Sequence, residues 1–217
     1  MKKLQPFLTG YGISKRYGGV EALCDVDIAM FPGEVIGLVG DTNSGKSTLL
    51  QLIAGVHTPD SGQFYVNGRL AKLSPAYHAA DYGIKVVHQQ INVAEHMHTL
   101  EFIFAGRAPN KRALTRWLGW WDQRTMYERA IAEFERLGFE PPPLNSRLRD
   151  LTSAQRKMVA YVHATIRRPQ LLLLDEPTDS LETHKPEIFR LITDVRQSGG
   201  TVLLVTQNID DIFQIAD

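Results

Sequence analysis

The sequence predicts an α/β fold with a largely parallel sheet. Short apolar runs alternate along the chain with segments of helical periodicity, an order typical of parallel sheets covered by helices. The runs at residues 171–174 and 202–205 are uninterrupted, as expected for strands that are buried on both faces. A third run, at 34–39, is followed by a loop bounded by glycines and then by a helix start at Ser47.

Before residue 90 we predict mainly strands, separated by glycine, proline and asparagine turns. Strands are expected at 7–13 and 26–30 with a turn over 14–23 between them, and a Pro32-Gly33 turn precedes the strand at 34–39. A helix at 47–54 follows the loop. Next come a strand from 63 that ends in an Asn67-Gly68 hairpin turn, a helix capped by Ser74 with Pro75 in its first position, and a strand at 84–88.

Beyond residue 90 the pattern becomes more helical. Helices are expected from Leu100 onward, at 124–137, from 151 to about 167, at 181–197 and at 209–216. Either Thr152 or Ser153 can cap the third of these helices. The basic and aromatic segment at 109–121 fits two interpretations: a contact with a partner or membrane surface, or a packed insertion with solvated arginines.

Residues 40–48 carry the most specific motif of the chain. They match G-x-x-x-x-G-K-[ST], the phosphate-binding loop, between a predicted strand and a predicted helix. Such a loop aims successive N–H groups into an anion-sized hollow, and the helix adds the positive end of its dipole. Lys46 is expected on the β- and γ-phosphates and the Ser47 hydroxyl on Mg²⁺. The predicted ATP-binding residues of the loop are Gly40, Asp41, Thr42, Asn43, Ser44, Gly45, Lys46, Ser47 and Thr48.

Two acids, Asp175 and Glu176, follow the apolar run at 171–174. At the carboxyl end of a strand, Asp175 is placed to hold Mg²⁺ and Glu176 to orient or deprotonate an attacking water. Coupled to the phosphate loop, this pair predicts nucleotide hydrolysis. Tyr17 is an aromatic residue that precedes the loop. It fits either stacking on a nucleotide base or an ordinary surface position.

Bulk composition limits the class of protein. A length of 217 residues suits one domain, or one core with a smaller lobe. With 24 basic and 24 acidic residues the net charge is zero, which argues against a nucleic-acid partner. Cys24 is the only cysteine, which excludes an internal disulfide and fits a reducing compartment. Residues 1–6 lack a signal-peptide core, and no apolar run reaches the ~18 residues of a membrane span. We therefore expect a cytoplasmic protein that can dock on a membrane component.

With these motifs in place, the chain resembles the ATP-binding subunits of ABC transporters over almost its whole length. Residues 173–178 closely match the family's Walker B run, and 14–23 resemble the segment that bears its adenine-stacking aromatic, which favours the base-stacking role for Tyr17. Residues 87–90 resemble the glutamine loop, which implies that Gln89 contacts Mg²⁺ or the attacking water. Gln207 stands where the family has a switch histidine.

Residues 151–155 take the place of the family's signature, L-S-G-G-Q, which closes over the ATP held by a second subunit. The resemblance implies ATP contacts for Thr152, Ser153, Ala154 and Gln155. Ser153 and Ala154 replace both glycines, however, and their Cβ atoms crowd a place where backbone must approach phosphate. Gln207 offers only a neutral hydrogen bond, and Asn43 stands where many relatives have a third loop glycine.

The resemblance implies a P-loop NTPase core of the ABC ATPase type: a mixed, largely parallel sheet, an inserted α-helical lobe and a small antiparallel N-terminal β-subdomain. It implies a single ABC ATP-binding domain over 1–217, with the core at 1–90 and 168–217 and the lobe at 91–167. Segments 87–92, 102–107 and 117–122 are most similar to single-domain ATPases of monosaccharide importers of the ribose, fructose or xylose type. The implied ligands and partners are ATP, Mg²⁺, polytopic permease subunits, a second ATP-binding subunit and, indirectly, a periplasmic sugar-binding protein, with the chain on the inner face of the cell membrane.

Two functions remain in competition. The first is an ATPase that drives a sugar importer through closure of an ATP-sandwiched dimer, favoured by Gln89, Asp175 and Glu176. The second is a degenerate subunit that binds ATP and dimerises but hydrolyses it poorly, as a regulator or as the partner of a standard ATPase. The altered signature and Gln207 favour the second. A third class, ABC-type ATPases that act on DNA or ribosomes, is disfavoured by the neutral charge and the absence of a second cassette.

Overall fold

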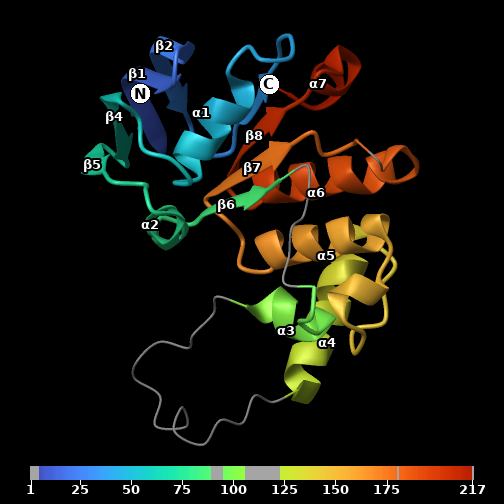
Figure 1. Ribbon diagram of the computed structural model, residues 1–217. Coiled ribbons are helices and arrows are strands. Elements are labelled where there is room, and N and C mark those ends of the chain that lie inside the picture. The colour runs from blue at the N-terminus through green and yellow to red at the C-terminus, as the bar shows by residue number, and fades with distance from the viewer. Residues whose placement is uncertain (1–4, 89–94, 106–122, 180, 217) are drawn as a thin grey trace, which may run out of the picture. The chain divides into compact units, whose positions relative to one another are not determined.

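The computed structural model describes residues 5–88, 95–105, 123–179 and 181–216. They form two compact units, one of Met1–Gln89 with Arg167–Asp217 and the other of Gln90–Ile166. Figure 1 shows all the labelled strands in the first unit and the helices α3, α4 and α5 in the second. An α/β fold with one antiparallel and one parallel sheet is confirmed.

The first unit begins with an antiparallel sheet of strand order β2-β1-β4-β5. β1 (Leu8–Tyr17) and β2 (Val20–Met30) form a long hairpin that turns at Gly18 and Gly19. The turn predicted over 14–23 is therefore wrong, because both strands continue through that region. Exposed polar residues there, and register shifts between Gly10 and Arg16, interrupt the apolar alternation by which a strand is recognised.

β4 (Ser61–Val66) and β5 (Arg69–Ala71) complete this sheet. They are joined by the predicted hairpin turn at Asn67 and Gly68, whose φ angles are 50° and 73°. A two-residue turn of this type needs positive φ at both positions, which Asn and Gly tolerate best. The hairpin prediction is confirmed.

The second sheet of this unit has the strand order β3-β8-β7-β6, with parallel pairing throughout its described strands. Its members are β3 (Val35–Leu38), β6 (Ile84–Val87), β7 (Leu171–Asp175) and β8 (Thr201–Val205). In parallel strands all carboxyl ends meet at one edge, where open α/β sheets bind ligands. The loops that follow β3, β7 and β8 therefore converge on a single place.

Helices precede or follow the strands of the parallel sheet. They are α1 (Lys46–Ile53), α2 (Ala76–Asp81), α6 (Lys185–Gln197) after the short 3₁₀ helix η3 (Glu182–His184), and α7 (Ile209–Ile215). The predicted start of α2 is wrong by one residue, because Pro75 rather than Ser74 occupies the N-cap position.

The core of the first unit lies where α1 packs between the sheets. Leu49, Leu50, Leu52 and Ile53 of α1 are buried among residues of both sheets. Leu171 and Leu173 of β7 belong to this core, whereas Leu172 and Leu174, on the alternate face, do not. Both sets are nonetheless fully buried. The strand is covered on both faces, which explains its uninterrupted apolar run.

A glycine in β3 allows α7 to approach the parallel sheet closely. A Cβ atom added at Gly37 would lie 2.4 Å from Cδ1 of Ile212 in α7. No real side chain tolerates that separation, so Ile212 occupies the space left by the missing side chain. The contact fixes where α7 lies relative to β3.

The second unit packs α3 (Thr99–Phe104), α4 (Gln123–Leu137) and α5 (Ser153–Thr165) together, with the 3₁₀ helix η2 (Leu148–Asp150) before α5. Ala130, Phe134 and Leu137 form the buried stripe of α4, as its periodicity predicts. Among the described residues, no helix combines the length and apolar character needed to cross a lipid bilayer.

Candidate nucleotide-binding site

A cleft of about 580 Å³ lies at the carboxyl edge of the parallel sheet. It brings together two segments that the sequence predicted as one site, the loop after β3 and the acids that end β7. Val20 and Ala22 of β2 and Val205 of β8 supply its apolar part. The remaining lining residues are Thr42, Asn43, Ser44, Gly45, Lys46, Ser47, Thr48, Asp175, Glu176 and Gln207.

The loop depends on backbone angles that few residues adopt. Gly45, the N-cap of α1, has φ of 88°, and a Cβ atom there would lie 2.3 Å from the carbonyl oxygen of Ala22. Glycine is therefore required both by its φ and by the close approach of β2. Asn43 has φ of 67°, in the left-handed region that asparagine visits more readily than most residues. The loop thus forms with asparagine at this position.

Lys46 is the first residue of α1, and its side chain bends back over the loop. Its ammonium donates hydrogen bonds to the carbonyl oxygens of Gly40 and Asp41 at 2.6 and 2.5 Å, and to Oγ of Ser44 at 3.1 Å. Only 8% of the residue is exposed. These contacts hold a positive charge at the N-terminus of α1, where the helix dipole also favours an anion. A phosphate oxygen can take the place of one of these acceptors.

Glu176 lies directly after β7 and is held in an unusual backbone conformation. Its φ is 46°, and its N–H donates a 2.8 Å hydrogen bond to the carbonyl oxygen of Val205. A non-glycine residue in the left-handed region costs about 1–2 kcal/mol, and such strain is concentrated at functional sites. The conformation places the Glu176 side chain in the same cleft as the phosphate loop.

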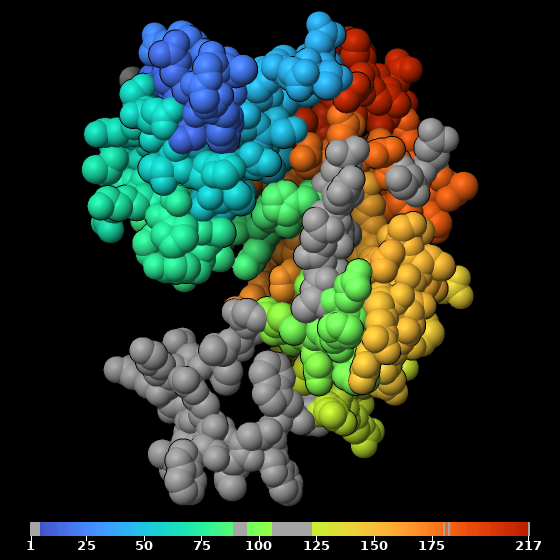
Figure 2. All heavy atoms as spheres, in the orientation of Figure 1, coloured from blue at the N-terminus to red at the C-terminus, as the bar shows by residue number. Residues whose placement is uncertain are grey.

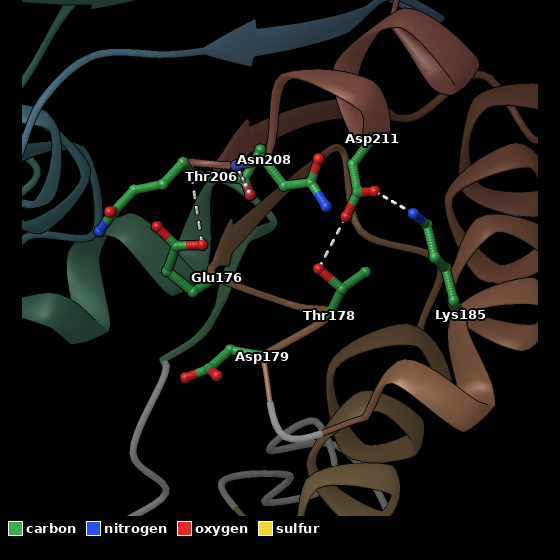
Figure 3. Close-up of a pocket in the computed structure, with 8 residues that line it drawn as sticks. Glu176, Thr178, Asp179, Lys185, Thr206, Asn208 and Asp211 are labelled. Carbon is green, nitrogen blue, oxygen red and sulfur yellow. Dashed lines mark hydrogen bonds and ion pairs between the residues drawn. The ribbon is translucent and has the colours of Figure 1, made fainter.

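Gln207 is exposed and lies two residues after the end of β8. Its backbone N–H donates to Oε2 of Glu176 at 3.4 Å. Both residues also line a second cavity of about 550 Å³, together with Thr178, Asp179, Lys185, Thr206, Asn208 and Asp211. Figure 3 draws these side chains, which come from the segments that follow β7 and β8, from the start of α6 and from α7.

The donors predicted for Mg²⁺ can be tested against the cleft. The Ser47 hydroxyl and the Asp175 carboxylate both line it. Oxygen ligands of this kind, few in number and with room for water and phosphate, are what Mg²⁺ prefers in proteins. The two residues therefore fit the ion. Gln89, the third predicted ligand, lies outside the described residues.

Tyr17 ends β1 and is not among the described residues that line the cleft. Its ring, 40% exposed, meets the ring of His57 edge-on at 5.6 Å, and Nζ of Lys15 lies 5.6 Å from its centroid. The ring lies at the end of β1, next to the hairpin turn. The contacts with His57 and Lys15 are compatible with both interpretations of Tyr17, stacking on a nucleotide base and an ordinary surface position.

The residues in the place of the family's signature lie in the second unit, at the start of α5. Thr152 is the N-cap: its Oγ1 accepts from the Gln155 N–H at 3.2 Å, and its own N–H donates to Oε1 of Gln155 at 3.0 Å. This capping box satisfies two of the donors at the helix start. Ser153 and Ala154 follow as the first helical residues. The segment at 109–121 and Ser180 lie outside the described part of the chain.

Sequence reasoning missed several residues of these cavities. Val20 and Ala22 were assigned to a turn, although the cleft is lined by the strand that they begin. Lys185 and Asp211 belong to the second cavity but lie 26 residues apart in the sequence, with no motif to link them.

Comparison with known proteins identifies relatives of the whole chain. A family model described as ABC transporter matches residues 23–179. The chain is 33% identical over 213 residues to the ribose import ATP-binding protein RbsA 1 of Agrobacterium fabrum, covering 98% of this chain and 41% of that protein. It is 32% identical to the arabinose import ATP-binding protein AraG of Chromohalobacter salexigens, covering 98% and 42%. The chain thus spans about two fifths of the length of these curated relatives.

Solved structures give the same result for the fold. The ADP conformation of MJ1267, an ATP-binding cassette of an ABC transporter, superposes with a TM-score of 0.78 at 25% identity, covering 98% of this chain and 85% of that one. A nucleotide-free ATP-binding cassette from an ABC transporter has a TM-score of 0.77 at 24% identity, over the same shares of the two chains.

Proposed function

Because the chain belongs to the ABC transporter family of ATP-binding domains, we propose that it binds and hydrolyses ATP as the energising subunit of a membrane importer. The observation that carries the proposal is a single cleft lined by both the phosphate loop and the acid pair. Those segments are about 130 residues apart in sequence. Their convergence supports one nucleotide site rather than two unrelated motifs.

The loop and α1 bind the phosphates of ATP in this proposal. Backbone N–H groups from Gly40 to Thr48 surround the phosphate chain, and Lys46 exchanges a loop acceptor for a β- or γ-phosphate oxygen. Tyr17 stacks on the adenine. Mg²⁺, when bound by Ser47, Asp175 and Gln89, neutralises charge on the β- and γ-phosphates.

Glu176 accepts a proton from, or orients, the water that attacks the γ-phosphate. Its unusual φ supports this role, since backbone strain is retained where side-chain placement matters. Gln207, beside it, donates a neutral hydrogen bond to the γ-phosphate. A cationic histidine would make a charge-assisted contact there, which is roughly twice as strong.

A second ATP-binding subunit completes the site. Thr152, Ser153, Ala154 and Gln155 of one subunit close over the ATP held by the other, at the positive end of α5. In this proposal residues 1–90 and 168–217 form the nucleotide core and residues 91–167 a helical lobe. The lobe faces the polytopic permease, on the inner face of the cell membrane.

Sugar is the proposed cargo of the importer. The relatives are named as ribose, ribose/galactose/methyl galactoside and arabinose import proteins, which supports a monosaccharide. A periplasmic sugar-binding protein would deliver it to the permease, so that no residue of this chain contacts the sugar.

A second candidate is a subunit that binds ATP and dimerises but turns it over poorly. The observation that favours it is the start of α5, where Ser153 and Ala154 carry Cβ atoms at positions that are glycine in the family signature. Such a subunit would act as a regulator or beside a partner with a standard signature.

A steady-state ATPase assay on the purified chain, paired with a binding titration of MgATP, tests both candidates. Turnover by the chain alone supports the motor, and binding without turnover supports the degenerate subunit. Absence of MgATP binding would overturn both. Co-purification with a polytopic membrane protein tests the importer role separately.

A further inference from the structure

A buried polar network lies behind the proposed catalytic residues. The Thr178 hydroxyl donates a 2.8 Å hydrogen bond to Oδ2 of Asp211, and the Lys185 ammonium forms an ion pair with Oδ1 of the same carboxylate. Asp211 is 1% exposed and Thr178 8% exposed. Figure 3 shows Asp211 between the two partners, with a dashed line to each.

The three residues come from three different segments. Thr178 lies two residues after Glu176, Lys185 begins α6, and Asp211 lies in the first turn of α7, four residues after Gln207. Asp211 therefore ties the segment that carries Glu176 to the segment that carries Gln207. The carboxylate accepts a hydrogen bond at Oδ2 and is ion-paired at Oδ1. This arrangement of the segments is stabilised, since separating the buried carboxylate from Lys185 leaves its charge uncompensated.

Three further contacts fix the same part of the chain. Ile212, the next residue, fills the space over Gly37 of β3. At the other side of Gln207, the Asn208 N–H donates to Oγ1 of Thr206 at 3.0 Å, and the Asn208 side chain caps α7 by accepting from the Asp210 N–H. Atoms of α7, red in Figure 2, otherwise lie at the surface, and Phe213 is 82% exposed. The helix is thus held mainly by its inner face.

We propose that Asp211 is a positioning residue for ATP hydrolysis, which holds the Gln207 segment against Glu176 through Thr178 and Lys185. This inference rests on the proposed function of the Glu176 cleft. Asp211 is not among the described residues that line that cleft, so we expect its removal to affect turnover rather than ATP affinity.

The test compares Asp211→Asn with Asp210→Asn. Asp210 is the neighbouring residue of the same helix, undergoes the same chemical change and is exposed. For Asp211→Asn we expect kcat to fall roughly tenfold or more, because a charge-assisted contact is lost. The Kd for MgATP should stay within about threefold of that of the unmodified chain. Asp210→Asn leaves both unchanged. Equal kcat in the two variants overturns the proposal.

Hydrogen exchange gives a readout that does not need turnover. In Asp211→Asn the amides of residues 206–212 exchange faster, while those of β7 and β8 keep their protection. Faster exchange through both strands would mean general unfolding and would overturn a positioning role. If the unmodified chain binds but does not hydrolyse ATP, the motor function fails while this measurement still decides the inference.

Thr178 provides a second pair of variants in case Asp211→Asn does not fold. Thr178→Val keeps the shape of the side chain but removes its hydroxyl, and Thr178→Ser keeps the hydroxyl. The proposal expects lower kcat and faster exchange at 206–212 in Thr178→Val, with both restored in Thr178→Ser. Unchanged kcat and exchange in Thr178→Val would overturn it.

Discussion

The backbone N–H of Gln207 donates a hydrogen bond to Oε2 of Glu176, across 31 positions of sequence. The contact follows from the sheet. β7 and β8 are parallel neighbours in which Asp175 pairs with Val205, and the Glu176 N–H continues that ladder by donating to the Val205 carbonyl. The residues that follow the two strands are therefore brought together. A substitution of Glu176 or of Gln207 therefore alters the environment of the other residue.

Glu176→Gln should abolish turnover while ATP binding is retained. The amide keeps the size of the side chain but cannot accept a proton, and general-base catalysis contributes roughly 100- to 10,000-fold. Steady-state phosphate release and a parallel MgATP titration measure the two effects. Glu135→Gln, an exposed position of α4, is the control and should match the unmodified chain. Turnover that survives in Glu176→Gln would remove Glu176 from the mechanism.

Lys46→Met should weaken MgATP binding by roughly 10- to 100-fold, because a hydrogen bond to a charged group contributes about 1.5–3 kcal/mol. The variant also leaves the Gly40 and Asp41 carbonyl oxygens without the ammonium that they now accept from. Isothermal titration with MgATP measures the affinity. Lys72→Met, at an exposed position of the same unit, makes the same change of side chain and should bind normally. Equal affinities would exclude Lys46 from phosphate binding.

Gly45→Ala and Gly199→Ala should separate backbone strain from close contact. Their φ angles are 88° and 86°, but an added Cβ meets the Ala22 carbonyl oxygen at 2.3 Å at Gly45 and nothing within 4 Å at Gly199. Strain alone costs about 1–2 kcal/mol, which lowers the Tm of Gly199→Ala by roughly 2–8 °C. The Tm of Gly45→Ala should fall clearly further than that of Gly199→Ala, and Gly45→Ala should also lose MgATP binding. Similar Tm values in a thermal scan would mean that β2 moves aside.

Gln207→His should raise turnover if the switch position limits it. A protonated imidazole gives a charge-assisted contact worth on the order of 1–3 kcal/mol, or about ten- to hundredfold in rate if the contact forms mainly in the transition state. Gln214→His, on the exposed side of α7, controls for adding a histidine nearby. An unchanged rate would assign the limitation to Ser153 and Ala154.

Asp60 should make stability depend on acid pH. The Lys15 ammonium donates to its Oδ1 at 2.8 Å and is the main cause that holds the pKa of Asp60 below its usual value; the Arg16 N–H, donating to Oδ2 at 2.7 Å, adds to it. A lowered folded pKa stabilises the fold above the unfolded pKa, and the effect is lost as pH falls through the folded pKa.

Asp60→Asn should therefore lower Tm at neutral pH, and the difference from the unmodified chain should disappear at the acid end of the titration. Thermal scans between about pH 7 and pH 2.5 measure it. Asp81→Asn, exposed at the end of α2, serves as the matched control. A difference in Tm that stays constant down to the lowest pH would contradict the assignment.

Local sequence signals predicted most of the fold. The buried strands β7 and β8 follow from apolar runs, and the turn at Asn67 follows from its positive-φ residues. Hydroxyl capping predicted a cap at Thr152 or Ser153, and Thr152 is the N-cap of α5. The strands at 7–13 and 26–30 lie in the inner half of the first hairpin, and its outer half was missed because that half is exposed and its register is irregular. Apolar periodicity arises from burial, so it does not reveal a strand whose residues are exposed to solvent.

The candidate site was predicted less completely than the fold. The loop and the acid pair have motifs, and the parallel sheet brings them together. Other features of the site depend on the strand order of the sheet. They are the φ of Glu176, the Lys46 side chain that bends back over the loop, and the contact between Thr178 and Asp211. Such relationships join residues tens of positions apart, and no spacing rule encodes them.

The contact between Gly37 and Ile212 restricts how the sequence can change. Because the isoleucine fills the volume that a side chain at position 37 would need, neither position can be varied alone without loss. Gly37→Ala displaces α7 and with it the segment that follows β8, whereas Ile212→Ala leaves a cavity. Only a simultaneous exchange, a larger residue at 37 with a smaller one at 212, preserves the packing. Paired substitutions at positions 37 and 212 can therefore be tolerated, whereas a single substitution at either position is destabilising.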